Sequence, residues 1–180
     1  MLTMTVEHAL NEFYDEYGYG EEGGIYKKWD MIKFGPIALP LPNLESRRTN
    51  IYLHDISHLV TGYDVSWLGE SSVSSWEVAT GGWGRLYFPW LLTLWAMAVG
   101  VMLYPRQSYR AFQLGLRMKN AFIGGLSKPA MYRLSLAELR LRLQRMDSEW
   151  IHRSYVVWAG LSLLVWWSPF IIGFLLYQLL

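Results

Sequence analysis

Two histidines and an acid lie within five residues of the chain, His54, Asp55 and His58, and Glu70 follows twelve residues later. On a helix, residues four apart lie one turn above each other, with Cβ atoms roughly 5–6 Å apart. At about 100° per residue, Asp55 falls within an arc about 100° wide with the two histidines. Imidazole and carboxylate groups are ligands of divalent metals. The spacing predicts one metal site held by His54, Asp55, His58 and Glu70.

An HxxxH pair by itself more often consists of ordinary buried histidines than of metal ligands. The residues around this pair, however, favour a metal site. Ile, Leu, Val and Tyr make up most of the segment, and buried charges need partners. A zincin protease is disfavoured, because Asp55 stands where that signature has a glutamate base one methylene longer. Two histidines with carboxylates suit Zn²⁺ as the first expectation, while Fe²⁺ and Mn²⁺ stay open.

Other charged residues lie near the predicted ligands. Arg47 and Arg48 precede His54 by about two helical turns, roughly 10 Å along the axis. Guanidinium groups bind carboxylates and phosphates well, so the two arginines are candidate substrate-binding residues, with a solvated helix start as the alternative. Glu77 lies seven residues after Glu70 and shares its face. We expect Glu77 to be a surface acid, with a place beside the ligands as the alternative.

The helix that carries the histidines is expected to begin after Asn43, whose side chain can cap it, and to end at Gly62. Its other faces are almost entirely apolar, which predicts a buried, central helix. Glu70 is expected to open the next helix, which runs to about Thr80. A carboxylate at that end lies near the positive pole of the helix.

The N-terminal third is expected to contain one longer helix and one short one. Val6, Leu10, Phe13 and Tyr17 recur at helical spacing, so the first helix should cover about 5–17. A loop should follow, then a short helix around 25–32. Glycine and three prolines in 35–43 predict an extended connector. Pro105 and the capping box that starts at Ser135 predict two basic helices in the second half.

The signature and several other segments resemble the coenzyme Q biosynthesis protein 4 family. Its metal-binding signature is His-Asp-x-x-His, eleven residues, then Glu, which matches the run from His54 to Glu70. Similar segments also precede the signature, lie inside it and follow it: Phe34-Gly35-Pro36, Leu39-Pro40-Leu41-Pro42-Asn43, Thr61-Gly62-Tyr63-Asp64, Gly69-Glu70, Ala111-Phe112-Gln113-Leu114-Gly115 and Leu136-Ala137-Glu138-Leu139-Arg140. The similarity covers roughly residues 25–146 and is most specific over 54–70.

The resemblance implies a role in ubiquinone biosynthesis. The family is credited with oxidative decarboxylation of a prenylated aromatic acid at ring carbon C1, which replaces the carboxyl with a hydroxyl, and with organising other ubiquinone-biosynthesis enzymes. Two alternatives stay open. One is a non-catalytic scaffold that binds a quinone or prenyl lipid, and the other, less favoured, is a metal-dependent lipid phosphate hydrolase. His-Asp phosphohydrolases need further ligands, and only His8 and His152 are left to supply histidine.

Charge is divided unevenly along the chain. Residues 1–84 carry five Lys or Arg against twelve Asp or Glu, whereas residues 105–153 carry ten against three. Such a split predicts that the second half faces an anionic surface. The ten tryptophans and twelve tyrosines favour a membrane as that surface, because these rings prefer the headgroup level. No nucleic-acid partner is expected. Cysteine is absent, so thiolate metal sites are excluded.

Two long segments carry no charge. Residues 155–180 are long and apolar enough for a transmembrane helix. Residues 86–104 are at the lower limit of the length that can span a bilayer. Because the resemblance requires the helices on either side to pack together, this segment should be buried or lie along the membrane interface.

The predicted fold class is all-α, with a helical metal-binding domain over 1–152, a membrane-associated basic half, and a C-terminal transmembrane anchor over 153–180. The metal-binding domain should lie on the cytoplasmic side, where Lys- and Arg-rich flanks stay. Expected partners are membrane lipid, a prenylated quinone precursor and other ubiquinone-biosynthesis enzymes.

Overall fold

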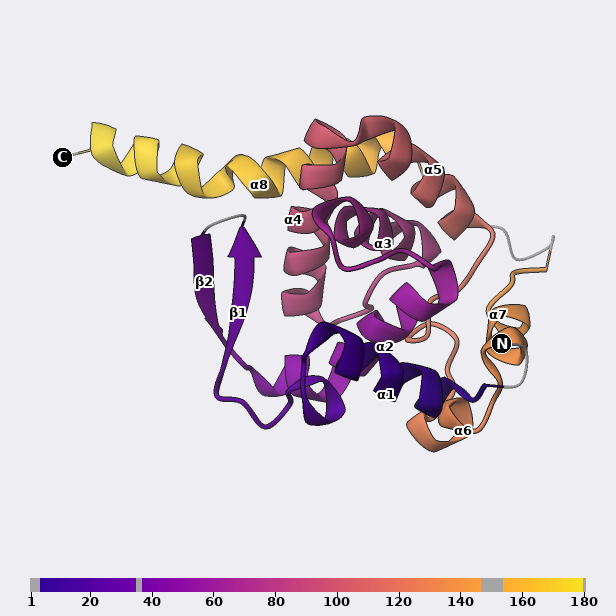
Figure 1. Ribbon diagram of the computed structural model, residues 1–180. Coiled ribbons are helices and arrows are strands. Elements are labelled where there is room, and N and C mark those ends of the chain that lie inside the picture. The colour runs from indigo at the N-terminus through magenta and orange to yellow at the C-terminus, as the bar shows by residue number, and fades with distance from the viewer. Residues whose placement is uncertain (1–3, 35–36, 147–153, 180) are drawn as a thin grey trace.

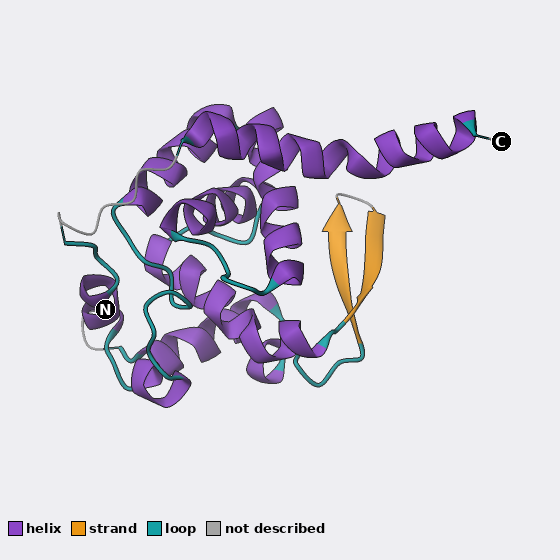
Figure 2. Cartoon of the chain, turned by 180° about the vertical axis from the view of Figure 1, so that it is seen from behind, coloured by secondary structure: helices purple, strands orange, loops and turns teal. Residues whose placement is uncertain are grey.

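The structure is a computed structural model that describes residues 4–34, 37–146 and 154–179. Helices make up most of this part of the chain, and one hairpin lies at the side of the helical body (Figures 1 and 2). The elements in chain order are α1 (Val6–Tyr17), the 3-10 turn η1 (Glu21–Gly23), β1 (Trp29–Phe34), β2 (Ile37–Pro42), α2 (Glu45–Thr61), α3 (Trp67–Thr80), α4 (Tyr87–Leu103), α5 (Pro105–Leu116), α6 (Lys128–Tyr132), α7 (Leu136–Arg142) and α8 (Tyr155–Gln178).

Helix α3 is the centre of the body. It packs against α5 and α4, while α2 contacts α3, α1, α4 and α7. Trp76 of α3, Met97 of α4 and Phe112 of α5 are fully buried. Every residue of α3 from Ser71 to Thr80 is buried, which explains the short and weakly polar side chains along it. The most buried helix is therefore the one that carries Glu70, not the one that carries the histidines.

Local sequence signals fix the ends of α2 and α3. Gly62 ends α2 in the left-handed conformation, with φ of 77°, as predicted. Helix α3 begins earlier than predicted, at Trp67, because Ser66 is its N-cap and accepts a hydrogen bond from the Gly69 amide at 3.2 Å. Glu70 still lies in the first turn of α3. The two helices therefore present their ligands to each other across a short turn.

Asn43 does not cap α2, so that prediction is wrong. The N-cap residue is Leu44, which makes no side-chain cap. The Asn43 side chain is buried and donates instead to main-chain carbonyls of the preceding loop, those of Gly24, Ile25 and Lys27, at 2.8–3.3 Å. Asn43 therefore ties the start of α2 to the loop after α1.

The short helix predicted around 25–32 is also wrong. Strand β1 pairs antiparallel with β2, from Trp29 opposite Pro42 to Phe34 opposite Ile37. Alternating prolines keep β2 extended, and a two-stranded ribbon tolerates them because each strand has a free edge. The helical class is confirmed for the body, and the hairpin is the exception.

The uncharged segments form α4 and α8. Helix α4 packs against α3, α5 and α8, in agreement with the expectation that it belongs with the other helices. Helix α8 has 24 residues and a mean hydropathy of 1.9, and it is long and apolar enough to cross a membrane. It runs along the body and then continues beyond it (Figure 1). The two basic helices begin as predicted, at Pro105 and at the capping box of Ser135 and Glu138.

Candidate metal site

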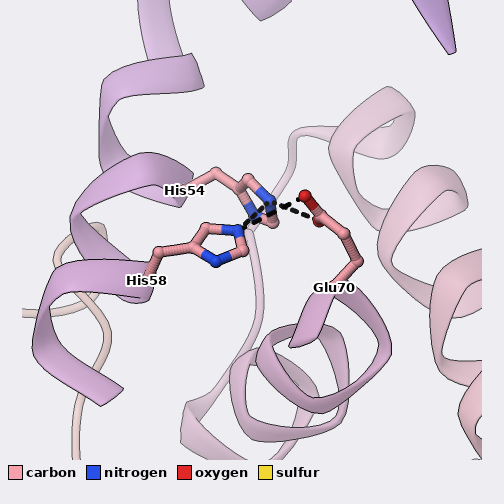
Figure 3. Close-up of side chains that lie close together, drawn as sticks. All are labelled: His54, His58 and Glu70. Carbon is pink, nitrogen blue, oxygen red and sulfur yellow. Dashed lines mark hydrogen bonds and ion pairs between the residues drawn. The ribbon is translucent and has the colours of Figure 1, made fainter. Parts of the chain in front are cut away.

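His54 and His58 of α2 and Glu70 of α3 converge on one point (Figure 3). The two Nε2 atoms are 3.3 Å apart. Glu70 Oε2 is 3.3 Å from Nε2 of His54, and Glu70 Oε1 is 3.6 Å from Nε2 of His58. This group could hold a metal ion, and it contains three of the four residues predicted as ligands.

The separations within the group match those of metal ligands. Ligand atoms about 2.0–2.1 Å from a tetrahedral Zn²⁺ are roughly 3.3–3.4 Å from one another. The two Nε2 atoms are 3.3 Å apart, and Glu70 approaches them with different oxygens, Oε2 at 3.3 Å from His54 and Oε1 at 3.6 Å from His58, while one ligand atom from each of the three residues lies within 4.8 Å of the others. The side chains therefore need little movement to coordinate one ion.

The other ring nitrogen of each histidine is engaged, which leaves both Nε2 atoms directed at the group. His58 Nδ1 lies 3.0 Å from the Tyr63 carbonyl oxygen, to which it donates. His54 Nδ1 lies 3.0 Å from Glu77 Oε1. Metal-binding histidines in general donate their second N–H to a carbonyl or a carboxylate in this way. The turn after α2 and the C-terminal half of α3 thus orient the two rings.

Glu77 is fully buried, so the expectation of a surface acid is wrong and the alternative beside the ligands is confirmed. Its Oε2 accepts a hydrogen bond from Thr93 Oγ1 at 3.3 Å, and Thr93 in turn accepts one from Trp83 Nε1 at 2.9 Å. Helix α4 supplies Thr93 and covers this face of α3. The seven-residue spacing from Glu70 indicated the shared face, but nothing local indicated that α4 would cover it.

Asp55 has a different environment from the other three predicted ligands. Its Oδ2 accepts a hydrogen bond from the Tyr14 hydroxyl at 3.0 Å, and both side chains are buried. Burial raises the pKa of Asp55 to about 6, although the charges of His54 and His58 and the Tyr14 hydrogen bond oppose the rise. Asp55 therefore joins α2 to α1 and lies outside the group of three.

Burial and the apposed charges shift the pKa values of His54 and Glu70 in opposite directions. Burial by itself lowers the pKa of His54, but the charge of Glu77 and the hydrogen bonds with Glu70 and Glu77 outweigh burial and hold it well above 6.5. Burial would raise the pKa of Glu70, but its hydrogen bonds with His54 and His58 lower it to about 2. Without a metal, an imidazolium of His54 lies between two carboxylates.

A cavity of about 480 Å³ opens beside the group. Arg47, Asn50, His54 and Glu70 line it on one side, and an apolar wall comes mainly from α4, with Phe88, Pro89, Leu92, Trp95 and Ala96. Arg47 is half-buried and donates from Nη1 to Asn43 Oδ1 at 3.0 Å. Arg48 is exposed and does not line the cavity. Of the two predicted arginines, only Arg47 is placed to meet a bound molecule.

The sequence leaves two further histidines as possible ligands, His8 and His152. His8 is exposed and pairs with Glu12 at 3.3 Å, and His152 lies outside the described residues. No family model, curated protein or solved structure matches this chain.

Proposed function

We propose that this chain is a membrane-associated metalloprotein of ubiquinone biosynthesis that carries out metal-dependent oxidative decarboxylation of a prenylated aromatic acid. His54, His58 and Glu70 hold the divalent metal, with Zn²⁺ as the first candidate. The observation that supports this most strongly is the group of three side chains, His54, His58 and Glu70, whose ligand atoms lie within 4.8 Å of one another beside a cavity lined by Arg47 and by apolar residues of α4. The reaction itself comes from the resemblance of the motif.

Three protein ligands favour a catalytic site over a structural one. Structural zinc sites in proteins are closed by four protein ligands, whereas catalytic sites keep a position for water or substrate. Among residues 4–34, 37–146 and 154–179 the group has three members, and two of them, His54 and Glu70, line the cavity. A bound divalent cation supplies Lewis acidity toward a carboxylate. The alternative of a non-catalytic scaffold with a closed site is less well supported.

The cavity suits a molecule with an acidic ring and an apolar tail. Arg47 lies two helical turns before His54 on α2, and both line the cavity. The Arg47 guanidinium binds the anionic end of the substrate, while Leu92 and Trp95 of α4 contact the apolar part. The domain lies on the cytoplasmic face of the membrane, where its basic second half meets anionic lipid and other ubiquinone-biosynthesis enzymes.

Purified full-length protein tests the metal and the reaction together. In mild detergent, native mass spectrometry should show one divalent ion per chain. A prenylated hydroxybenzoic acid supplied with O₂ and a two-electron reductant should release one CO₂ for each hydroxylated product, since one oxygen atom enters the ring and the other leaves as water. His58→Ala and Glu70→Ala should each lose the ion, because removal of one ligand leaves uncompensated charge and opens the shell. Stoichiometric metal in both variants would refute the site. Metal binding without CO₂ release would favour the scaffold.

Arg47 and Arg48 offer a matched pair for the anion-binding step. Arg47→Ala should keep the metal and bind a hydroxybenzoic acid about tenfold more weakly or worse, because a charge-assisted contact is lost. Arg48→Ala removes the same charge from an exposed neighbour outside the cavity and should change affinity little. Equal affinities for the two variants would remove Arg47 from the substrate site.

A further inference from the structure

The buried serines of α3 differ in their hydrogen bonds. Ser71 and Ser72 donate to the Leu68 carbonyl at 3.2 and 2.6 Å, and Ser75 donates to the Ser71 carbonyl at 2.7 Å. Ser74 is 2% exposed, lines the cavity, and makes no hydrogen bond with a residue that the structure describes. Because a buried hydroxyl without a partner costs free energy, the Ser74 hydroxyl is available to a molecule in the cavity.

Ser74 lies next to the ring of His54. Glu70 Oε2 is 3.3 Å from Nε2 of His54, and Glu77 Oε1 is 3.0 Å from Nδ1 of the same ring. Ser74 is four residues after Glu70 and three before Glu77, so the three side chains share one face of α3. The Ser74 hydroxyl therefore lies where the cavity meets the metal group.

Asn50 of α2 brings a hydrogen-bond acceptor to the same cavity. Its Nδ2 donates to the Ser46 carbonyl at 2.8 Å, and because a carbonyl can only accept, this bond fixes the orientation of the amide. Its Oδ1 has no partner among residues 4–34, 37–146 and 154–179, and Asn50 lines the cavity. Asn50 lies three residues after Arg47 and four before His54, on one face of α2.

Asn50 and Ser74 lie on the same side of the metal group. His58 meets Glu70, whereas His54, one turn earlier on α2, reaches Glu70 and also Glu77, further along α3. The two helices therefore run in opposite directions past each other. One turn before His54 on α2 is Asn50, and one turn after Glu70 on α3 is Ser74. The polar wall of the cavity thus continues from the metal group past these two side chains toward Arg47.

We propose that Asn50 and Ser74 form a hydrogen-bonding subsite for a hydroxyl group on the ring of the bound acid. Asn50 Oδ1 accepts a hydrogen bond from this hydroxyl, and the Ser74 hydroxyl donates one to its oxygen. The inference rests on the proposed function, in which the acid binds between Arg47 and the metal. Asn50 and Ser74 then determine specificity and are not metal ligands.

A hydroxyl group matches this subsite better than other ring substituents do. Ethers, second carboxylates and quinone oxygens only accept hydrogen bonds, so each of them leaves Asn50 Oδ1 facing another acceptor. A site built to bind a ligand hydroxyl rejects the analogue that lacks it, because the polar groups of the site are left unpaired. The subsite therefore favours a phenol over a quinone.

Two ligands that differ by one methyl group test the subsite. The full chain, loaded with Zn²⁺ in mild detergent, is titrated with a geranylated 4-hydroxybenzoic acid and with its 4-methoxy ether. Binding is followed by tryptophan fluorescence, since Trp67 and Trp95 line the cavity. The unmodified protein should bind the hydroxy acid about tenfold more tightly or better. Ser74→Ala and Asn50→Leu should each reduce this preference to about threefold or less, mainly by weakening the hydroxy acid.

Two further variants are matched controls. Ser72→Ala removes an equally buried hydroxyl of α3 that lies outside the cavity. Thr49→Val removes a side-chain hydrogen bond to the main chain of α2, from Oγ1 to the Glu45 carbonyl at 2.8 Å, at an exposed position beside Asn50. Both variants should keep the preference. Because the preference compares two ligands in one variant, a general loosening of the cavity affects both affinities and cancels.

The outcomes separate the subsite from the proposed function. Equal affinities of the unmodified protein for the two acids, or an unchanged preference in both Ser74→Ala and Asn50→Leu, would overturn the subsite and leave the metal and acid sites standing. Binding of neither acid by the metal-loaded protein would refute the acid site and the subsite together. A preference that depends on both residues, without CO₂ release, would support the subsite and count against the reaction.

Discussion

At the scale of single residues, the Glu77–His54 hydrogen bond should tune metal affinity. Glu77→Gln keeps the size of the side chain but removes the buried charge that Nδ1 of His54 faces. We expect metal affinity to fall about 10–100-fold, as when other partners of metal-binding histidines are lost. Competition with a chromophoric chelator measures this. Glu12→Gln neutralises an exposed acid and is the control. Equal affinity in the two variants would show that Glu77 has no part in the site.

His54 should couple stability and metal affinity to pH in opposite directions. Its folded pKa lies well above 6.5, so protonation stabilises the metal-free fold fully below pH 6.5, and this contribution is lost as pH rises through the folded pKa. Metal binding requires neutral imidazole, so affinity should rise with pH, by up to tenfold per unit while His54 titrates. The lowered pKa of Glu70, about 2, matters only below pH 4.5.

Calorimetry in the presence of a chelator, and metal titration from pH 6 upward, check the two trends. The melting temperature of the metal-free protein should fall with rising pH, and metal affinity should increase. His54→Gln should flatten the first trend, since it removes the titrating group. A metal affinity that weakens as pH rises would contradict the assignment of His54 as a ligand.

At the scale of elements, helix ends that depend on a few neighbouring residues were predicted correctly from the sequence. Gly62 ends α2, Pro105 starts α5, and Ser135 with Glu138 forms the predicted capping box. Each signal depends on residues within one helical turn. The histidine spacing likewise brought His54 and His58 together on one face of α2. These features required no knowledge of what packs against them.

Features that depend on packing from distant segments were not predicted. From the sequence alone Glu77 was expected to be a surface acid, but α4 covers it and Thr93 of α4 donates a hydrogen bond to it. Asp55 is adjacent to His54 in sequence, but its buried Oδ2 accepts a hydrogen bond from Tyr14 of α1. Asparagine is a common helix cap, but the Asn43 side chain donates a hydrogen bond to the Lys27 carbonyl in the preceding loop and caps no helix. In all three cases a partner 16 to 41 residues away decides the role.

The N-cap of α3 should support both stability and the site, because Glu70 lies in its first turn. Ser66→Ala removes the hydrogen bond to the Gly69 amide and should cost about 1 kcal/mol in the free energy of unfolding. It should also weaken metal binding several-fold, since it loosens the turn that positions Glu70. Ser127→Ala removes the corresponding cap of α6, which carries no ligand, and should leave affinity unchanged. Chemical denaturation and chelator competition measure the two effects.

At the scale of the whole molecule, the packing of the helices restricts where a membrane can lie. Helix α1 contacts α6 and α7, and Lys128 pairs with Glu22 at 3.0 Å, so acidic N-terminal and basic C-terminal parts belong to one body. That body cannot be divided by a membrane between α3 and α5, because α3 packs directly on α5. Both halves must therefore lie on the same side.

We expect that side to be the cytoplasm, because Lys- and Arg-rich segments next to a membrane helix are retained there. Single cysteines at the exposed positions Asn11 of α1 and Ala130 of α6 should both resist an impermeant thiol reagent in intact cells and react after permeabilisation. Labelling of both Asn11 and Ala130 in intact cells would place the body outside. Labelling of Asn11 alone would mean that α4 crosses the membrane, which the contacts between α1 and α6 forbid in a single folded body.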